Sequence, residues 1–337
     1  MFQAEFVITE RCNFNCDYCY MINRDVMMSR EVFDAHFESL PRILEDFDES
    51  RYTFVYFGGE PLMNWGLIED TLSIVQNHSL CSGINLPTNG FLLDDYKIRI
   101  LKAYQVNVSL SYDGLWQKNF HDLPHLRKII REFGFRSCKA MITPDHLTKK
   151  SLVDNYESFL ELGIPDPDFT LVRDKIWKAE SVNLFEKNLV ELTDKVIEKN
   201  KKGIETLPGI FSLYILDTLA GKKFGKRKFN CFAGIHGLAF MPDGEVYPCA
   251  RFGSLKINDW PKFKNTEDYE ICKKCELRQY CNAGCSYSQW INNGEPLVSI
   301  CKLLKICYRE AFRLVDELKD NETFRKKLNS LIKENNL

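Results

Sequence analysis

The sequence predicts an α/β protein whose first half is built on a parallel sheet. Short apolar runs recur along this half, amphipathic helix patterns separate them, and cysteine motifs occur in both halves of the chain. With 337 residues, 45% of them hydrophobic, the chain can bury a large core and is expected to form two domains. Six strand–helix repeats imply parallel strands that are joined by right-handed crossovers.

The elements are predicted in order along the chain. The apolar run Phe6-Val7-Ile8 predicts a buried strand over residues 4–9, and Ser29 is placed to cap a helix that runs towards residue 45. Further strands are predicted over 52–57, 83–87, 106–111, 136–142 and 168–172, and helices over 67–77, 94–104, 120–133 and 149–162.

Four regions follow from this pattern. Residues 1–175 are expected to form the sheet domain and residues 176–230 a helical bridge, with an amphipathic helix over 181–200. Residues 231–307 form a cysteine-rich domain, and residues 308–337 read as a charged helical tail.

Composition narrows the range of functions. The formal net charge is −2 and the isoelectric point is near 6.3, so the chain lacks the basic excess of nucleic-acid-binding proteins. No signal peptide opens the sequence, and no apolar run is long enough to predict a membrane span. The 13 cysteines favour metal binding, because disulfides are rare in a reducing cytosol. We therefore expect a cytoplasmic protein that binds neither nucleic acid nor membrane.

Three cysteines follow the first predicted strand. Cys12, Cys16 and Cys19 have the spacing C-x3-C-x2-C. A [4Fe–4S] cluster is normally held by four cysteines, so three thiolates leave one iron open to a ligand that is not protein. Short cysteine spacings also suit zinc, which is the alternative for this motif taken alone.

Glycine-rich and polar turns follow the next strands. They are Gly58-Gly59-Glu60-Pro61, Thr88-Asn89-Gly90 and Ser111-Tyr112-Asp113-Gly114. Glycine allows a close approach of the backbone to a ligand. In barrels of parallel strands the active site lies at the carboxyl ends of the strands, so these turns and the cysteine loop are expected at one site.

A second cysteine pattern occupies the second half of the chain. It contains a compact C-x2-C-x5-C-x3-C segment and a glycine, Gly244, that twelve residues separate from the first cysteine. The seven cysteines are Cys231, Cys249, Cys272, Cys275, Cys281, Cys285 and Cys301.

The first cysteine loop, followed by the GGEP motif, resembles the radical S-adenosylmethionine (SAM) enzymes. The resemblance implies a partial (β/α)6 barrel in which the open iron chelates SAM, and one electron then cleaves SAM to a 5′-deoxyadenosyl radical. The seven-cysteine pattern resembles the SPASM domain of the same enzymes. The implied fold class is therefore α/β, a partial barrel followed by a small cysteine-rich domain that binds two auxiliary iron–sulfur clusters, expected as [4Fe–4S].

The resemblance also implies roles in SAM binding. Tyr18 would pack on the adenine, Gly58, Gly59 and Glu60 would hold the amino group, and Ser111 would reach the ribose. Asp113 would either do the same or cap the next helix. Asn89 would contribute to this site or serve its turn alone.

The resemblance divides the second cysteine group between two clusters. Cys272, Cys275, Cys281 and Cys301 would ligate the distal cluster, and Cys231, Cys249 and Cys285 the proximal one, which lacks an obvious fourth ligand. Some relatives have a cysteine about six residues before the first of the domain, where this chain has Gly225. Three cysteines are left over as remote candidates, although we expect them to be small buried residues: Cys81, Cys138 and Cys307.

SPASM relatives mostly modify peptides and proteins. The implied function is the oxidation of a ribosomally made peptide to a crosslinked or dehydrogenated product, with an electron donor such as flavodoxin or ferredoxin as a partner. Sulfatase maturases carry an Asp directly after the second cysteine of the domain; here the residue is Ala250, which argues against formylglycine formation. Only eleven residues precede Cys12, so we expect a peptide substrate to need either a separate protein that binds its leader or contacts from the helical bridge and the tail.

Other functions stay open at this point. A small-molecule dehydrogenase or epimerase, acting on an aminoglycoside-like substrate, would use the same cofactors. A zinc-binding module without redox activity would explain the cysteines but not the GGEP motif. A non-catalytic relative conflicts with the intact first cysteine triad. The sequence points to no catalytic residue that acts on the substrate.

Overall fold

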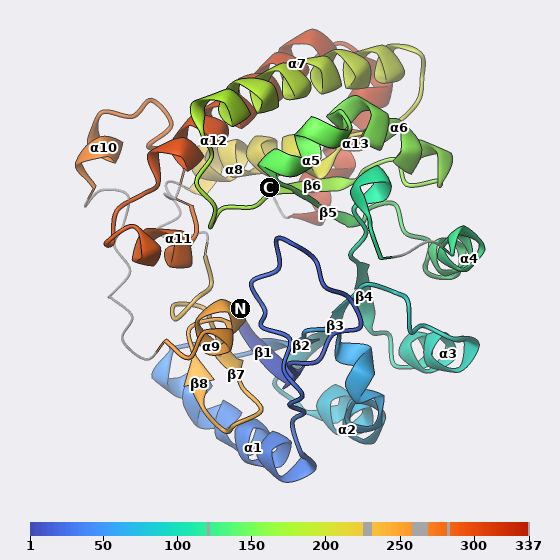
Figure 1. Cartoon of the computed structure of the whole chain (residues 1–337), viewed down its shortest axis with the longest axis vertical. Helices are drawn as coiled ribbons and strands as arrows, with labels where there is room; N and C mark the ends of the chain where they lie inside the picture. Colours follow the sequence, from blue (N-terminus) through green and yellow to red (C-terminus); the bar gives the residue numbers. More distant parts are fainter. Residues whose placement is uncertain (120–121, 225–230, 258–268, 282–283, 336–337) are drawn as a thin grey trace. The chain divides into compact units, whose positions relative to one another are not determined.

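The computed structural model describes residues 1–119, 122–224, 231–257, 269–281 and 284–335 (Figure 1). The chain forms two compact units. The first comprises Met1–Ser111, Lys118–Gly134 and Cys231–Trp260, and the second comprises Tyr112–Gln117, Phe135–Asn230 and Pro261–Leu337. The cysteine-rich region is therefore shared between the units, and the four regions expected from the sequence stay a prediction.

A six-stranded sheet forms the centre of the first unit. Its order is β4-β3-β2-β1-β7-β8. Every neighbouring pair in this sheet is parallel except β7 and β8, which are antiparallel. Their bounds are β1 (Phe2–Thr9), β2 (Tyr52–Gly58), β3 (Cys81–Thr88), β4 (Asn107–Leu110), β7 (Gly237–Phe240) and β8 (Val246–Tyr247). Because β1 to β4 are parallel, the loops that follow them leave from the same edge of the sheet.

Aromatic side chains pack one face of this sheet against helix α1 (Arg30–Asp46). The ring of Phe6 in β1 lies 5.2 Å from the ring of Phe33 in α1 and 4.6 Å from the rings of Phe54 and Phe240. All four side chains are fully buried. Burial of each contributes about 2 kcal/mol to stability. Ser29 caps α1 by accepting a hydrogen bond from the Val32 amide, as the sequence predicts.

Four further helices lie in the described residues of the first unit. They are α2 (Trp65–Asn77), α3 (Asp95–Ala103), α4 (Leu123–Phe133) and α9 (Ala250–Ser254), with a 3₁₀ turn over Pro61–Asn64.

The second unit is mainly helical. Its strands β5 (Lys139–Ile142) and β6 (Asp168–Leu171) pair in parallel as a sheet of their own. Helix α12 (Val298–Leu318) packs on α7 (Ala179–Lys201) and α8 (Gly209–Phe224). The other helices are α5 (Pro144–Lys149), α6 (Leu152–Glu161), α10 (Glu270–Lys273), α11 (Ser286–Ile291) and α13 (Glu322–Glu334), with a 3₁₀ turn over Gly114–Trp116.

The α/β class with parallel strands is confirmed, and two expectations need correction. The helix predicted over 149–162 begins later, at Leu152, because Lys150 is extended and Ser151 caps the helix; the short helix α5 before it was not predicted. The six predicted strands do not form one sheet, because β5 and β6 pair separately and β7 lies beside β1. Gly237 permits that pairing, since a Cβ there would lie 2.6 Å from the Gln3 carbonyl oxygen.

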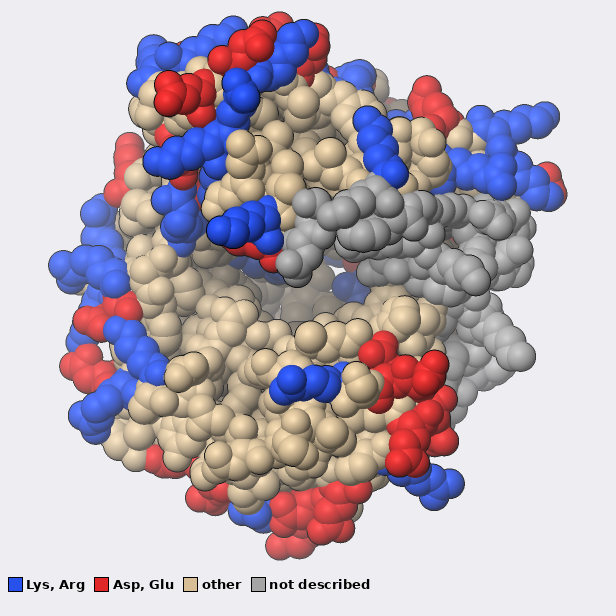
Figure 2. Space-filling model, turned by 180° about the vertical axis from the view of Figure 1, so that it is seen from behind, with Lys and Arg blue, Asp and Glu red and all other residues tan. Residues whose placement is uncertain are grey.

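The face that Figure 2 shows carries charged side chains of both signs among uncharged ones. Exposed ion pairs such as Arg30–Asp34, at 2.8 Å, contribute about 0.5 kcal/mol or less. Among the described helices, none combines the length and the apolar character that a bilayer crossing requires.

Candidate functional site

The N-terminal cysteine loop joins β1 to α1 in the first unit. The Cys19 amide donates a hydrogen bond to the Cys16 carbonyl oxygen at 3.0 Å, and the Phe14 amide lies 3.4 Å from Cys12 Sγ. The loop is closed at its base, where the Glu10 amide donates to the Val26 carbonyl oxygen at 2.9 Å. The backbone therefore holds the loop in a compact turn at the end of β1.

The three thiols of this loop lie close enough together to interact electrostatically. Burial raises the pKa of Cys12 to about 11, and the negative charges of Glu60, Cys19 and Cys16 contribute to this rise. Thiolates gathered in this way repel one another until a metal cation offsets their charge. The structure thus places Cys12, Cys16 and Cys19 on one short loop, and their binding of an iron–sulfur cluster stays a prediction.

Glu60 connects the ends of three strands. Its buried carboxylate accepts hydrogen bonds from the Leu62 amide at 3.1 Å, from Thr88 Oγ1 at 2.7 Å and from the Asn89 amide at 2.8 Å. Its own amide donates to the Arg11 carbonyl oxygen at 2.8 Å. Burial raises the pKa of Glu60 to about 7 in spite of these donors. The GGEP glutamate therefore fixes the cysteine loop and the turn after β3 to one another.

The two glycines before Glu60 touch the backbone of the cysteine loop. A Cβ on Gly58 would lie 2.3 Å from the Thr9 carbonyl oxygen, and one on Gly59 would lie 2.3 Å from the Arg11 carbonyl oxygen. The Gly59 amide donates to the Thr9 carbonyl oxygen at 3.0 Å. Close packing against the loop explains why these positions require glycine.

Asn89 reaches the cysteine loop by its side chain. Its Nδ2 donates to Asn13 Oδ1 at 2.8 Å, and its Oδ1 accepts from the Phe91 amide at 3.0 Å. Asn89 thus serves its own turn and also positions the loop. Asn13 was not predicted from the sequence, because only the fold brings it to Asn89.

The other predicted SAM contacts have separate surroundings. Tyr18 is half-buried on the cysteine loop, and exposed Ser111 follows β4 with its amide bonded to the Thr88 carbonyl oxygen at 2.8 Å. Asp113 belongs to the second unit. Its carboxylate accepts from the Met141 amide at 2.8 Å and makes no helix-capping hydrogen bond, so the capping alternative is wrong. The roles of these three residues in SAM binding stay predictions.

Residues 118–119 also contact the cysteine loop, and no local sequence signal indicates this contact. Lys118 forms an ion pair with Asp17, and Asn119 Nδ2 lies 4.0 Å from Cys16 Sγ. Both residues belong to the first unit, so this short segment packs against the cysteine turn within that unit.

A second group of polar side chains lies around Glu5 of β1. The Ala250 amide donates to the Glu5 carboxylate at 3.2 Å, and burial raises the pKa of Glu5 to about 7. The Arg251 guanidinium stacks on the Tyr20 ring at 4.2 Å. Burial and the charge of Glu5 raise the pKa of Tyr20. A carboxylate inside an apolar strand is the one signal that could have drawn attention to this group.

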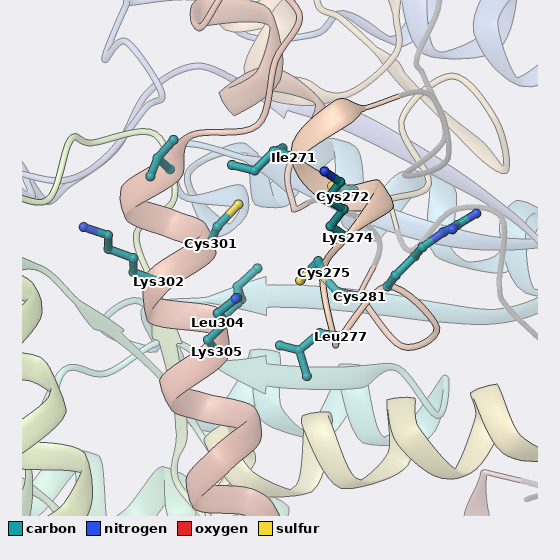
Figure 3. Close-up of a pocket in the computed structure, with 12 residues that line it drawn as sticks. Ile271, Cys272, Lys274, Cys275, Leu277, Cys281, Cys301, Lys302, Leu304 and Lys305 are labelled. Atoms are coloured by element: carbon teal, nitrogen blue, oxygen red, sulfur yellow. The ribbon is translucent and has the colours of Figure 1, made fainter.

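Four cysteines of the second unit surround one cavity of about 300 Å³ (Figure 3). Cys301 on α12 and Cys275 on the facing segment direct their sulfur atoms into the space between them. Cys272 and Cys281 line the same cavity. Burial and the neighbouring thiols raise the pKa of Cys301 to about 11. The structure therefore brings together all four cysteines expected to hold the distal cluster.

The thiols are spread around this cavity. Within the described parts of the chain, no three His, Cys, Asp or Glu side chains gather closely enough to hold a single metal ion.

The remaining predicted ligands are divided between the units. Cys231 and Cys249 belong to the first unit and Cys285 to the second, so their common site stays a prediction. Gly225 lies outside the described residues. Cys138 and Cys307 are buried, as expected of structural cysteines, and Cys81 is half-buried.

Comparison with known families decides the nature of the N-terminal loop. Residues 6–166 match the family model described as the Radical SAM superfamily. Residues 6–166 form a radical SAM domain. The matched range contains both the cysteine triad and the GGEP motif, and the zinc alternative for this loop is set aside. SAM and a [4Fe–4S] cluster are the cofactors of this family, and the prediction of these two cofactors is thereby confirmed.

Two curated relatives match most of the chain. It is 23% identical over 328 residues to the radical SAM cyclopropyl synthase TigE of Paramaledivibacter caminithermalis, which covers 83% of this chain and 67% of that protein. It is 24% identical over 330 residues to the cysteine-type anaerobic sulfatase-maturating enzyme of Clostridium perfringens strain 13, with 81% and 85% covered.

Solved structures give the same fold. Native anSMEcpe with bound AdoMet and Cp18Cys peptide matches with a TM-score of 0.70 at 20% identity, over 95% of this chain and 100% of that chain. Hexahistidine-tagged anSMEcpe with bound AdoMet matches with a TM-score of 0.72 at 19% identity, over 99% and 98%.

Proposed function

We propose that this radical SAM protein is an oxidoreductase that modifies a ribosomally made peptide by a crosslink or a dehydrogenation. The observation that carries the proposal is the second group of thiols, Cys272, Cys275, Cys281 and Cys301, around one cavity. A chain that only cleaves SAM needs the first cysteine triad alone. A second iron–sulfur site adds a place for an electron taken from the substrate.

The chain's own residues would prepare the site. Cys12, Cys16 and Cys19 would hold the cluster, which supplies the electron that cleaves SAM. Glu60 and Asn89 fix the loop through hydrogen bonds to the turn after β3. A loop held in this way positions a reactive group without further reorganisation, and positioning is decisive for a reactive radical.

The electron count supports an oxidation. Removal of a hydrogen atom from a substrate C–H leaves a carbon radical, and a new bond or double bond then requires the loss of one more electron and one proton. The four thiols of the distal site, and Cys231, Cys249 and Cys285 of the predicted proximal site, would hold the groups that accept this electron. The net change is the loss of two hydrogens.

Similarity to known proteins favours a peptide substrate. The names of the relatives include a sulfatase-maturating enzyme, and one similar structure contains a peptide. Ala250 occupies the position at which maturases carry an Asp, so we propose a crosslink or dehydrogenation in place of formylglycine formation. We further propose a cytoplasmic location, a flavodoxin- or ferredoxin-type electron donor and a separate protein that binds the leader peptide.

The mass of the product tests the proposal. The anaerobically reconstituted chain is incubated with SAM, a reductant and a precursor peptide encoded beside its gene. A peptide lighter by two hydrogens supports the proposal. An unchanged mass with one deuterium gained from heavy water would establish an epimerase, and conversion of a small molecule alone would replace the peptide as substrate.

A further inference from the structure

The four-thiol cavity of the second unit has a basic rim. Besides the cysteines, it is lined by Lys274, Arg278, Lys302 and Lys305, and all four are exposed. Lys274 and Arg278 lie on the segment after α10. Lys302 and Lys305 lie on the first turns of α12. Positive charge therefore surrounds a site where thiolates are expected to hold an iron–sulfur cluster.

Most of this charge is not neutralised by the residues that the structure describes. Lys305 pairs with Glu276 at 3.5 Å, and nearby Lys273 pairs with Glu270. Lys274, Arg278 and Lys302 form no ion pair within the described ranges. The opening therefore carries a local positive charge, although the formal net charge of the whole chain is −2.

Apolar side chains lie between these charges. Ile271 is 45% exposed and Val298 is 54% exposed, and both line the cavity. Apolar contacts surrounded by polar ones are the usual composition of a protein–protein interface. The cavity opening thus combines exposed apolar side chains with surrounding charged ones, as protein–protein interfaces do.

We propose that a small acidic electron-carrier protein docks on this rim and exchanges one electron with the group that Cys272, Cys275, Cys281 and Cys301 hold. This inference rests on the proposed function. In each encounter one electron passes between carrier and cluster, one being oxidised and the other reduced, and no atom is transferred. An electron that the cluster has taken from the substrate leaves by the same surface, to an oxidised carrier.

The charges of the rim suit a transient partner. Opposite charges accelerate encounter, and the acceleration falls as salt screens them. Complexes of electron carriers bury little surface, so a docking site of this kind does not need an extended interface. A substrate peptide could also meet a basic surface, and the experiment separates the two partners.

The test is the rate at which a photoreduced flavodoxin reduces the clusters of the anaerobically reconstituted full chain, followed by stopped-flow absorbance. The triple variant Lys274→Glu/Arg278→Glu/Lys302→Glu is expected to react at least roughly tenfold more slowly than the parent at low ionic strength. High salt should remove most of the difference.

A matched variant controls for net charge. Arg325→Glu/Lys326→Glu/Lys333→Glu changes the charge by the same amount on exposed positions of α13, which Figure 1 shows well away from α10 within the second unit. This variant should react at the parental rate. Equal slowing of both triple variants, or no slowing of the rim variant, would overturn the proposal.

Iron analysis and a competition experiment show why the rim variant or the parent behaves differently from the expectation. If the rim variant loses iron, the milder Lys274→Gln/Arg278→Gln/Lys302→Gln variant with full iron content replaces it. If the parent itself holds no iron at the four thiols, the proposed function fails as well. Competition of flavodoxin by the precursor peptide would assign the rim to the substrate and overturn the docking of a carrier.

Discussion

Two buried carboxylates, Glu5 and Glu60, lie inside the fold and outside the cysteine motifs of the sequence. Glu60 could be predicted, since the GGEP motif includes it. The hydrogen bond of Glu5 could not, because its partner Ala250 is 245 residues away in the sequence. Spacing along the chain identifies motifs, whereas contacts such as this one exist only after folding. The same reason explains why Asn13 and Asn119 were missed while the cysteines were found.

The raised pKa of Glu5 predicts how stability depends on pH. Burial raises this pKa from 4.5 to about 7, so between these values the folded chain keeps a proton that the unfolded chain has lost. The contribution of Glu5 to stability is therefore present at low pH and is lost as pH rises through about 7. Glu5→Gln cannot ionise. We expect its stability relative to the parent to increase by up to about 1.4 kcal/mol per pH unit across this window.

Urea unfolding of parent and Glu5→Gln under anaerobic conditions, at several pH values between about 5 and about 8, checks this expectation. The raised pKa of Glu60 affects both proteins equally and cancels in the difference. A stability difference that stays constant with pH would contradict the buried, raised-pKa state of Glu5.

Strands and helices could be predicted from the sequence where a capping residue or an apolar run marks them. Ser29 marks the start of α1, and the apolar runs mark β1 to β4. The break between α5 and α6 had a signal in Ser151, a capping residue inside the predicted helix. The pairing of β7 with β1 had none, because a strand of four residues does not specify its partner. The arrangement of the strands therefore had to come from the structure.

The contact between the GGEP turn and the cysteine loop gives a prediction for Gly59. In Gly59→Ala, the new Cβ would lie 2.3 Å from the Arg11 carbonyl oxygen, so the backbone of the loop must move. We expect this variant to lose the N-terminal cluster, which is about four of the irons bound by the parent, and to lose SAM cleavage.

Gly66→Ala is the matched control. Nothing lies within 4 Å of its added Cβ in the first turn of α2, and alanine is the better helix former there. This variant should keep full iron content and SAM cleavage, measured by iron analysis and by 5′-deoxyadenosine formation. Normal iron binding by Gly59→Ala would show that the close contact does not hold the loop.

For the whole molecule, the arrangement of thiols predicts how much iron the chain binds. One radical SAM cluster and two auxiliary [4Fe–4S] clusters give about twelve irons. Cys301→Ala removes one thiol from the cavity of the second unit and is expected to lower the count by about four while SAM cleavage continues. Cys81→Ala removes a thiol outside all motifs and should leave the count unchanged. A parent that saturates at about four irons would contradict both auxiliary sites.

The most direct test of the account is to replace Cys12, Cys16 and Cys19 together with alanine in the full chain. Because these thiols belong to the first unit and the four-thiol cavity belongs to the second, the variant should lose about four irons and keep the rest. With SAM and dithionite, it should form no 5′-deoxyadenosine, while the parent forms it readily. Formation of 5′-deoxyadenosine by the triple variant would show that this cysteine loop does not hold the cluster that cleaves SAM.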